Sequence, residues 1–197
     1  MAGNSRIGFV GVGRMGANMA RRLKEEGYII RSVHDRNSKN TESLARELSC
    51  EAVSSPARVA DLCDVVLTVV SDDAAMHEIF LETSPNSLLA HAKDRLFINF
   101  ATVNPEVHVK VEGLVERHGG ASLEGLMASS INQAREGTLY LMCGGKKSVF
   151  EQAHAMLHAL SPKPLYIGPA GEAAKVKALV NMAVSYTHLT LPTNREV

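Results

Sequence analysis

The sequence predicts an α/β fold, in which a mostly parallel sheet is wound with helices on both of its faces. Short apolar runs alternate along the 197 residues with stretches whose apolar positions recur at helical spacing. The runs Arg6–Val10 and Asp64–Val70 are largely apolar, as in parallel strands that are buried on both faces. The first run also ends in a glycine-rich turn before a helical stretch, which is typical of a doubly wound sheet.

The glycine-rich turn has the spacing Gly-x-Gly-x-x-Gly, formed by Gly11, Gly13 and Gly16. In such a turn the first glycine allows the bend, the second lets the backbone approach a pyrophosphate, and the third lets helix and strand pack closely. The helical stretch Ala17–Glu26 follows, and a helix N-terminus attracts an anion through free N–H groups and the helix dipole. We therefore predict a Rossmann-type, doubly wound dinucleotide-binding domain over residues 1–168, with cofactor contacts at Gly11, Gly13, Arg14, Met15 and Gly16.

The same pattern requires an acidic residue at the end of the second strand. Tyr28–Val33 is the predicted strand, and Asp35 lies nineteen residues after Gly16. An aspartate there accepts hydrogen bonds from the ribose 2′-hydroxyl and favours NAD, whereas Arg36 can stack on adenine and pair with a 2′-phosphate, which favours NADP. The sequence predicts NAD or NADP as cofactor and leaves the choice open. A solvated charged turn that binds nothing is the alternative.

The remaining elements alternate between helix and strand up to about Ile167. Pro105 stands near the start of its helix, where the missing N–H of proline costs nothing. The sequence predicts helices at Asn40–Leu48, Val59–Leu62, Ala74–Leu81, Pro105–His118 and Lys147–Leu160, and strands at Glu51–Val53, Asp64–Val70, Leu96–Phe100, Leu139–Cys143 and Pro164–Ile167.

Composition excludes several classes of function. Acidic and basic residues balance at 21 each and are interspersed, which disfavours nucleic acid and membrane surfaces as partners. No apolar run reaches the roughly 18 residues of a membrane span, and the first strand leaves no room for a signal peptide. The three cysteines lack Cys-x-x-Cys spacing, and His154 and His158 lack a third ligand. We expect a cytoplasmic protein without a metal site.

Three further segments make the chain resemble the β-hydroxyacid dehydrogenase family, which includes 3-hydroxyisobutyrate dehydrogenase, tartronate semialdehyde reductase and, more distantly, phosphogluconate dehydrogenase. The first, Phe100–Pro105, is similar to the family's Ser-Thr-x-x-Pro strand end, and the second, Leu123–Gly145, carries the family's spacing of Ala-Arg-Glu-Gly-Thr-Leu, Met and Gly-Gly. The resemblance implies that Thr102 lies by the nicotinamide and that the backbone at Val70 and Ser71 lies beside its ribose.

The third segment, Gly171–Asn181, places Lys177 one helical turn before Asn181, as the family does. Oxidising an alcohol requires that a base remove the hydroxyl proton while a hydride leaves for the nicotinamide. A partly desolvated lysine can take that proton and return it, because burial brings its pKa towards the working pH. The resemblance therefore implies that Lys177 is the general acid/base and that Asn181 orients the substrate or the lysine. Two ordinary lysines on an exposed helix are the alternative.

The family's substrate loop reads Asp-Ala-Pro-Val-Ser-Gly-Gly, and here Glu124–Ser130 takes its place. The serine position is Ala128, and Ser129 and Ser130 replace the two glycines. Their Cβ atoms restrict a backbone that glycine leaves free. We predict substrate contacts at Ala128, Ser129, Ser130, Lys177 and Asn181, and the substrate itself is left undetermined.

In the family the chain continues into a long interdomain helix and an all-helical second domain, through which related enzymes assemble. We expect residues 169–183 to begin that helix, the rest of the domain to be missing, and a homo-oligomer to need it. Val184–Thr193 is rich in β-branched residues, has no helical period, and looks like the translation of a transposase-type sequencing adapter. We expect residues 184–197 to be non-native, which long-read sequencing of the source locus tests.

The resemblance implies an NAD(P)-dependent oxidoreductase that transfers a hydride between nicotinamide and a short β-hydroxyacid or its semialdehyde, of the 3-hydroxyisobutyrate or 2-hydroxy-3-oxopropionate type. Imine reduction is a second interpretation, but it typically replaces the lysine that this chain keeps as Lys177. A third is a non-catalytic dinucleotide-binding module, which the altered substrate loop supports.

Overall fold

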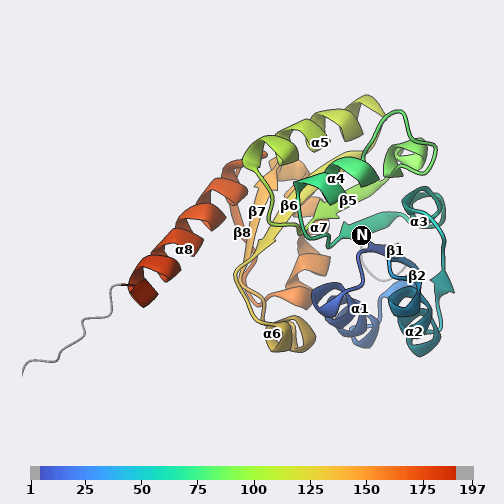
Figure 1. Cartoon of the computed structure of the whole chain (residues 1–197), viewed down its shortest axis with the longest axis horizontal. Coiled ribbons are helices and arrows are strands. Elements are labelled where there is room, and N and C mark those ends of the chain that lie inside the picture. The colour runs from blue at the N-terminus through green and yellow to red at the C-terminus, as the bar shows by residue number, and fades with distance from the viewer. Residues whose placement is uncertain (1–4, 190–197) are drawn as a thin grey trace, which may run out of the picture.

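The computed structural model describes residues 5–189, with side chains described up to residue 183. The described residues form one eight-stranded sheet with helices on both faces (Figure 1). The strand order is β3-β2-β1-β4-β5-β6-β7-β8, and the pairs are parallel except β6 with β7. The chain winds outwards from β1 to β3 and then returns to continue from β4 on the other side of β1. The predicted Rossmann-type α/β fold is therefore confirmed.

The strands agree with the predicted ones to within a residue or two where both exist. β3 is a short edge strand, and β4 lies in the centre of the sheet. The strands of the sheet are β1 (Arg6–Val10), β2 (Ile29–His34), β3 (Glu51–Ala52), β4 (Val65–Thr68), β5 (Leu96–Asn99), β6 (Ala121–Met127), β7 (Leu141–Gly145) and β8 (Leu165–Gly168).

Most helices begin at a residue whose side chain accepts a hydrogen bond from the first turn. Ser55, Asp72 and Asn104 cap helices in this way, and the helices after Ser55 and Asn104 have proline at their first position. The helices are α1 (Arg14–Glu25), α2 (Ser38–Leu48), α3 (Pro56–Leu62), α4 (Asp73–Ile79), α5 (Pro105–Arg117), α6 (Ile131–Glu136), α7 (Lys147–Leu160) and α8 (Glu172–Leu189), with a 3₁₀ turn η1 (Leu88–His91).

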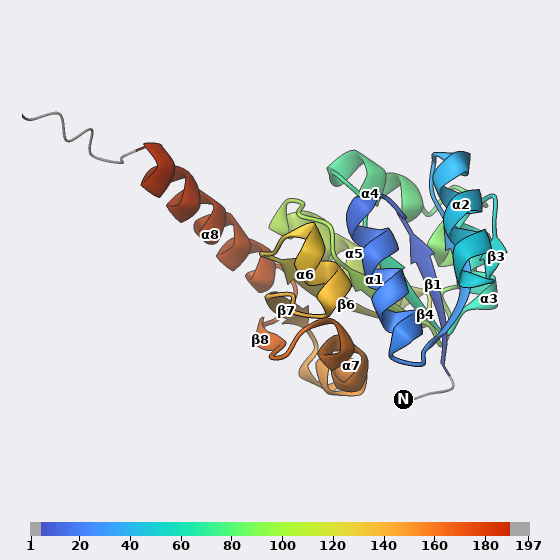
Figure 2. The same cartoon turned by 90° about the horizontal axis from the view of Figure 1, so that it is seen from below.

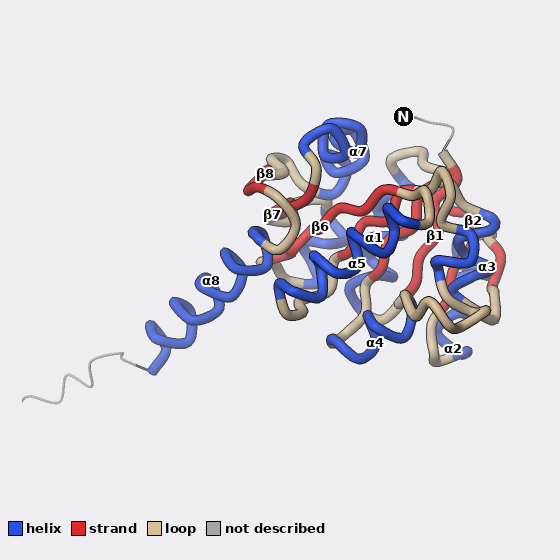
Figure 3. Tube along the Cα trace, turned by 90° about the horizontal axis from the view of Figure 1, so that it is seen from above, coloured by secondary structure: helices blue, strands red, loops and turns tan. Residues whose placement is uncertain are grey.

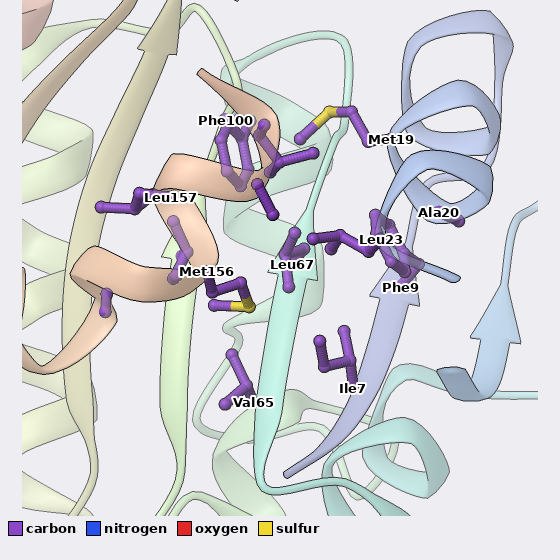
Figure 4. Close-up of a cluster of buried hydrophobic side chains, with 14 of the residues drawn as sticks. Ile7, Phe9, Met19, Ala20, Leu23, Val65, Leu67, Phe100, Met156 and Leu157 are labelled. Atoms are coloured by element: carbon purple, nitrogen blue, oxygen red, sulfur yellow. The ribbon is translucent and has the colours of Figure 1, made fainter. Parts of the chain in front are cut away.

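The core lies in two layers, one on each face of the sheet. Phe9 of β1 packs with α1 and α7 on one face, whereas the next residue, Val10, packs with α3, α4 and α5 on the other (Figure 4 shows part of the first cluster). Alternate residues of a strand point to opposite faces, so a strand buried on both faces must be apolar throughout. This explains why β1 and β4 read as continuous apolar runs.

Besides the 3₁₀ turn η1, two elements were not predicted, and both lie between β5 and β7. Residues 121–127 form strand β6, so the predicted substrate loop Glu124–Ser130 is a loop only from Ala128 onwards. β6 pairs in parallel with β5 and antiparallel with β7. Helix α6 follows, and it begins with a capping box in which Ser130 accepts from Gln133 N and donates its own N–H to the Gln133 side chain.

Helix α8 runs to Leu189, beyond residue 183, where the sequence pattern predicts its end. The reason is that serine, threonine and tyrosine cost only a few tenths of a kcal/mol each in a helix, and no glycine or proline interrupts this stretch. The proposed boundary between native and adapter-like sequence leaves no mark on the backbone, and residues 190–197 lie outside the described residues. Figures 2 and 3 show α8 leaving the sheet beside β7 and β8, at the edge far from β3.

Candidate active site

The glycine-rich turn joins β1 to α1 at the carboxyl edge of the sheet, and its glycines are needed for different reasons. Gly11 has a φ of +91°, and a Cβ there would lie 2.3 Å from the carbonyl oxygen of Val69. A Cβ on Gly16 would lie 2.1 Å from the carbonyl oxygen of Gly11. Beside Gly13, by contrast, no atom lies within 4 Å of such a Cβ. Gly11 and Gly16 therefore allow the bend and the close packing, and Gly13 leaves space beside its backbone.

Asp35 follows β2 and holds this turn in place. Its Oδ2 accepts a hydrogen bond from Val12 N at 2.8 Å, and its Oδ1 accepts one from Asn37 N at 2.9 Å. The carboxylate thus fixes the glycine-rich turn relative to the start of α2. Because a carboxylate has about four acceptor sites, these two bonds leave capacity for a ribose hydroxyl.

A cavity of about 520 Å³ opens at the carboxyl ends of β1, β2 and β4. It lies where the winding of the sheet changes direction, between β1 and β4, which is where open α/β sheets bind ligands. Six of the predicted cofactor residues line it, namely Gly11, Gly13, Asp35, Arg36, Val70 and Ser71. The sequence did not single out several others that also line it, among them Asn37, Asn40, Pro56, Glu78, Ile79 and Asn86.

The lining of this cavity fits a dinucleotide. Apolar groups from Pro56 and Ile79 suit a flat base, Asp35 and Arg36 suit a ribose, and the turn at Gly13 has room for a pyrophosphate. The other predicted residues of the turn do not line the cavity. Arg14 is exposed at the start of α1, Met15 packs against the core, and Gly16 is buried under the turn.

The loops after β4 and β5 are tied to each other. Asp72 caps α4, and the hydrogen bond from Ala75 N, together with that from the Ser71 hydroxyl, holds the pKa of Asp72 below its ordinary value. Asp73 Oδ1 accepts a hydrogen bond from Asn104 N at 3.1 Å, which connects the two loops. Thr102 is exposed in the second of these loops and does not line the cavity.

The three predicted substrate-contact residues after β6 already form hydrogen bonds within the protein. Ser129 Oγ accepts a hydrogen bond from Tyr140 N at 2.7 Å, and Ser130 Oγ caps α6. Each hydroxyl also carries one O–H that can donate. Ala128 has no hydroxyl, and its N–H donates to the carbonyl oxygen of Tyr140 at 3.1 Å.

Lys177 and Asn181 lie on α8, outside the cavity. Lys177 is half-buried, and this desolvation lowers its pKa. Asn181 is exposed. Lys175, by contrast, is exposed and forms an ion pair with Glu172 at 2.8 Å, which raises the pKa of Lys175. The two lysines of this helix are therefore in different environments.

A buried carboxyl group that the sequence did not mark as special lies under the start of α8. Glu124 on β6 is 2% exposed, and its oxygens accept hydrogen bonds from Gly171 N and from Ala174 N. Burial raises its pKa to about 7, although the two N–H groups act in the opposite direction. No sequence signal identifies this contact, because it joins residues 47 and 50 positions apart.

Two further findings concern the described residues alone. None of their helices is long and apolar enough to cross a membrane. Within the same part of the chain, no group of three or more His, Cys, Asp or Glu side chains is arranged to hold a metal ion.

The strand, the glycine turn, the helix and the cavity at the switch point together define a dinucleotide-binding domain of the Rossmann type. A family model described as the NAD binding domain of 6-phosphogluconate dehydrogenase matches residues 6–168. The chain belongs to this family of NAD-binding domains.

Curated relatives and a solved structure are similar to this chain over most of its length. The chain is 29% identical over 177 residues to glyoxylate/succinic semialdehyde reductase 1 of Arabidopsis thaliana, covering 89% of this chain and 60% of that protein. It is 27% identical over 181 residues to the cytokine-like nuclear factor N-PAC of Danio rerio, covering 91% of this chain and 38% of the relative. The structure of Mycobacterium tuberculosis 3-hydroxyisobutyrate dehydrogenase with L-serine superimposes with a TM-score of 0.83 at 28% identity, covering 94% of this chain and 62% of that one. The chain thus spans less than two thirds of each of these proteins.

Proposed function

We propose that this chain is the cofactor-binding part of an NAD(P)-dependent oxidoreductase acting on a short β-hydroxyacid and its semialdehyde, of the 3-hydroxyisobutyrate or 2-hydroxy-3-oxopropionate type. One observation carries the proposal of a reaction: Lys177 is desolvated on a helix that packs beside β6, while its neighbour Lys175 is exposed and ion-paired. The names of the reductase and of the dehydrogenase among the relatives support the substrate class.

In this proposal the chain's residues divide the work between two regions of the carboxyl edge. The glycine turn, Asp35 and Arg36 hold the dinucleotide, with Thr102, Val70 and Ser71 nearer its nicotinamide end. A bound nicotinamide would accept or return a hydride at the substrate's carbinol carbon. The neutral Lys177 amine takes the hydroxyl proton during oxidation, and its ammonium returns the proton during reduction. Asn181 and the residues Ala128, Ser129 and Ser130 orient the substrate.

The test is to replace Lys177 by alanine in the full-length enzyme, with Lys175→Ala as the matched control. Loss of a general acid/base lowers turnover by about 10²- to 10⁴-fold. We therefore expect such a loss for Lys177→Ala, with NAD(P)H affinity unchanged, because Lys177 does not line the cofactor cavity. The Lys175→Ala variant should keep its turnover to within about twofold. Equal turnover of the two variants would show that Lys177 is not the acid/base.

A non-catalytic dinucleotide-binding module is the second candidate. Ala128 replaces the family's serine, and the hydroxyl oxygens of Ser129 and Ser130 already accept hydrogen bonds from the backbone. One of the relatives is moreover named as a nuclear factor rather than as an enzyme. This candidate predicts that Lys177→Ala changes only the stability of its helix. Imine reduction is less well supported, because it typically lacks the lysine that is present here.

We also propose that the oligomer, if the whole protein forms one, assembles through the region that follows α8. Leu179 and Met182 are 64% and 68% exposed on this helix and offer apolar surface that a following region could cover. Sedimentation of the full-length protein and of this chain, compared at equal concentration, tests the proposal. Identical oligomeric states for both would contradict it.

A further inference from the structure

The carboxyl group of Glu124 lies in a space that the neighbouring strand leaves open for it. Glu124 pairs with Gly144 across the antiparallel strands β6 and β7. A Cβ on Gly144 would lie 3.0 Å from both Cδ and Oε1 of Glu124, and 3.1 Å from Oε2. Such distances are shorter than ordinary contacts, so a side chain on Gly144 would push the carboxyl group away. The glycine therefore makes room for a carboxyl group inside the protein.

Both oxygens of this carboxyl group bind the start of α8. Oε1 accepts a hydrogen bond from Gly171 N, and Oε2 accepts one from Ala174 N at 3.1 Å. The first N–H groups of a helix have no partner within the helix and carry the positive end of its dipole. A helix usually meets this need with the side chain at its own N-cap. Here a strand that is distant in sequence supplies the acceptor and so ties α8 to the sheet.

The tie also sets the rotation of α8. Ala173 is fully buried in one apolar cluster with Leu126 of β6 and Met142 of β7. Glu124 and Leu126 point to the same face of β6, because they are two residues apart. Lys177 follows Ala173 by four residues and therefore lies on the same face of the helix, one turn further on. The contacts that hold Ala173 and Ala174 against β6 thus determine how deeply Lys177 is buried.

We propose that Glu124 is a positioning residue for Lys177: its carboxylate ties the first turn of α8 to β6 and thereby holds Lys177 in its desolvated place. The catalytic meaning of this arrangement rests on the proposed function, but the tie and its effect on Lys177 do not. Other charged groups near Glu124 are Glu112 of α5 and Glu172 and Lys175 of α8, and the thiol of Cys143 lies on β7. In the described part of the chain, the acceptor for Gly171 N and Ala174 N is Glu124 rather than any of these groups.

The test compares Glu124→Gln with Glu172→Gln in the chain as it stands. Glutamine keeps the shape of the side chain but places an NH₂ group against one of the two N–H donors. At a pH well above the Glu124 pKa of about 7, where the carboxylate is ionised, hydrogen exchange at the amides of Gly171 and Ala174 should accelerate about tenfold or more in Glu124→Gln, since a charge-assisted hydrogen bond is lost. Amides of β1 and β2 should be unaffected. Glu172→Gln removes a partly exposed charge from the same helix and should leave all of these rates unchanged.

The pKa of Lys177, measured by NMR titration of its side chain, separates positioning from simple electrostatics. If Glu124 holds Lys177 in place, Glu124→Gln exposes the lysine, and its pKa rises towards the ordinary value of 10.5. Loss of a negative charge alone would move the pKa of Lys177 the other way. Gly144→Ala, which displaces the carboxyl group without removing its charge, should also raise it, and this variant replaces Glu124→Gln if that protein does not fold.

Two results would overturn the proposal. The first is faster exchange at Gly171 and Ala174 with an unchanged or lowered pKa of Lys177. The second is an equal acceleration at all amides, which would mean that Glu124 affects only global stability. Neither readout involves turnover, so a failure of the acid/base assignment, seen in Lys177→Ala, is distinguishable from a failure of the tie.

Discussion

His108 on α5 shows how a single buried ring fixes the loop that carries Thr102. Its Nε2 lies 3.3 Å from the carbonyl oxygen of Ala101, and the residue is 2% exposed. Among the described residues, Nδ1 of this ring has no hydrogen-bond partner. A neutral ring with its proton on Nε2 satisfies the carbonyl group and leaves Nδ1 as an acceptor. Burial lowers the pKa of His108 to about 4, although the Ala101 carbonyl and the charge of Asp73 oppose the shift.

This lowered pKa predicts a loss of stability in mild acid. Between about pH 4 and 6.5 the unfolded chain holds the proton on His108 and the folded protein does not. The stabilisation is therefore complete above pH 6.5 and is lost as the pH falls towards 4, to a total of about 3 kcal/mol. His108→Gln keeps a donor of similar reach but does not titrate. Urea unfolding across this range should show a steeper dependence on pH for the wild type than for the variant, and parallel curves would contradict the prediction.

Also at the scale of residues, the sequence indicated which residues form the glycine-rich turn, but it did not indicate which residues form the walls of the cavity. The spacing of the glycines and the position of Asp35 follow from local requirements of one turn, so they were visible in the sequence. The cavity walls at Pro56, Ile79 and Asn86 were not, because they come together only when the segments that follow β3 and β4 meet. The burial of Glu124 was equally hidden, since an isolated glutamate in a sequence is usually exposed.

At the scale of elements, the packing of β1, the glycine-rich turn and α1 predicts different effects for alanine at Gly16 and at Gly13. Gly16→Ala places its Cβ 2.1 Å from the carbonyl oxygen of Gly11 and should cost about 1–3 kcal/mol of folding free energy, as overpacking does. Gly13→Ala meets no atom within 4 Å and should fold normally. Its methyl group would instead occupy space beside the cavity, so we expect NAD(P)H to bind at least about tenfold more weakly, a difference of about 1.4 kcal/mol.

Urea unfolding and a calorimetric titration with NAD(P)H measure the two effects separately. A Gly16→Ala protein as stable as the wild type would refute the packing role. Unchanged affinity in Gly13→Ala would show that the turn does not hold the cofactor.

Strand β6 was not predicted because its stability comes from distant partners. Strand β6 contains Gly125 and the buried polar residues Ser122 and Glu124, so it lacks both the apolar run and the regular alternation of a typical strand. Its place is set instead by β5 on one side and β7 on the other. Helix α6 did have a local signal, the Ser-x-x-Gln capping box of Ser130 and Gln133, which a closer search for caps would find. The strands β1 and β4 were predicted from their continuous apolar runs alone.

At the scale of the whole molecule, the cavity presents Asp35 and Arg36 together, and we expect their balance to decide between NAD and NADP. A ligand that binds only the folded protein raises its stability by about 2.7 kcal/mol at a hundred times its dissociation constant. Thermal unfolding with NADH and NADPH should therefore show a shift with at least one of them. Because Arg36 can pair with a 2′-phosphate, Arg36→Ala should reduce the NADPH shift more than the NADH shift.

Arg46→Ala on the exposed part of α2 is the matched control and should change neither shift. Preferential stabilisation of the wild type by NADH would assign the dominant role to Asp35. Absence of a shift with either cofactor would contradict the dinucleotide assignment of the cavity.

Helix α8 is attached to the sheet near its first turn, so a small change of angle there moves the rest of the helix. Its 18 residues extend about 27 Å, and within the described residues its packing on the sheet is concentrated near Ala173 and Ala174. A tilt of roughly 5° at this pivot displaces Lys177, one turn further on, by about 0.5 Å, and the end of the helix by about 2 Å. The position of the rest of α8 therefore depends on its first turn, where the Glu124 carboxyl group and a few apolar side chains fix the angle between the helix and the sheet.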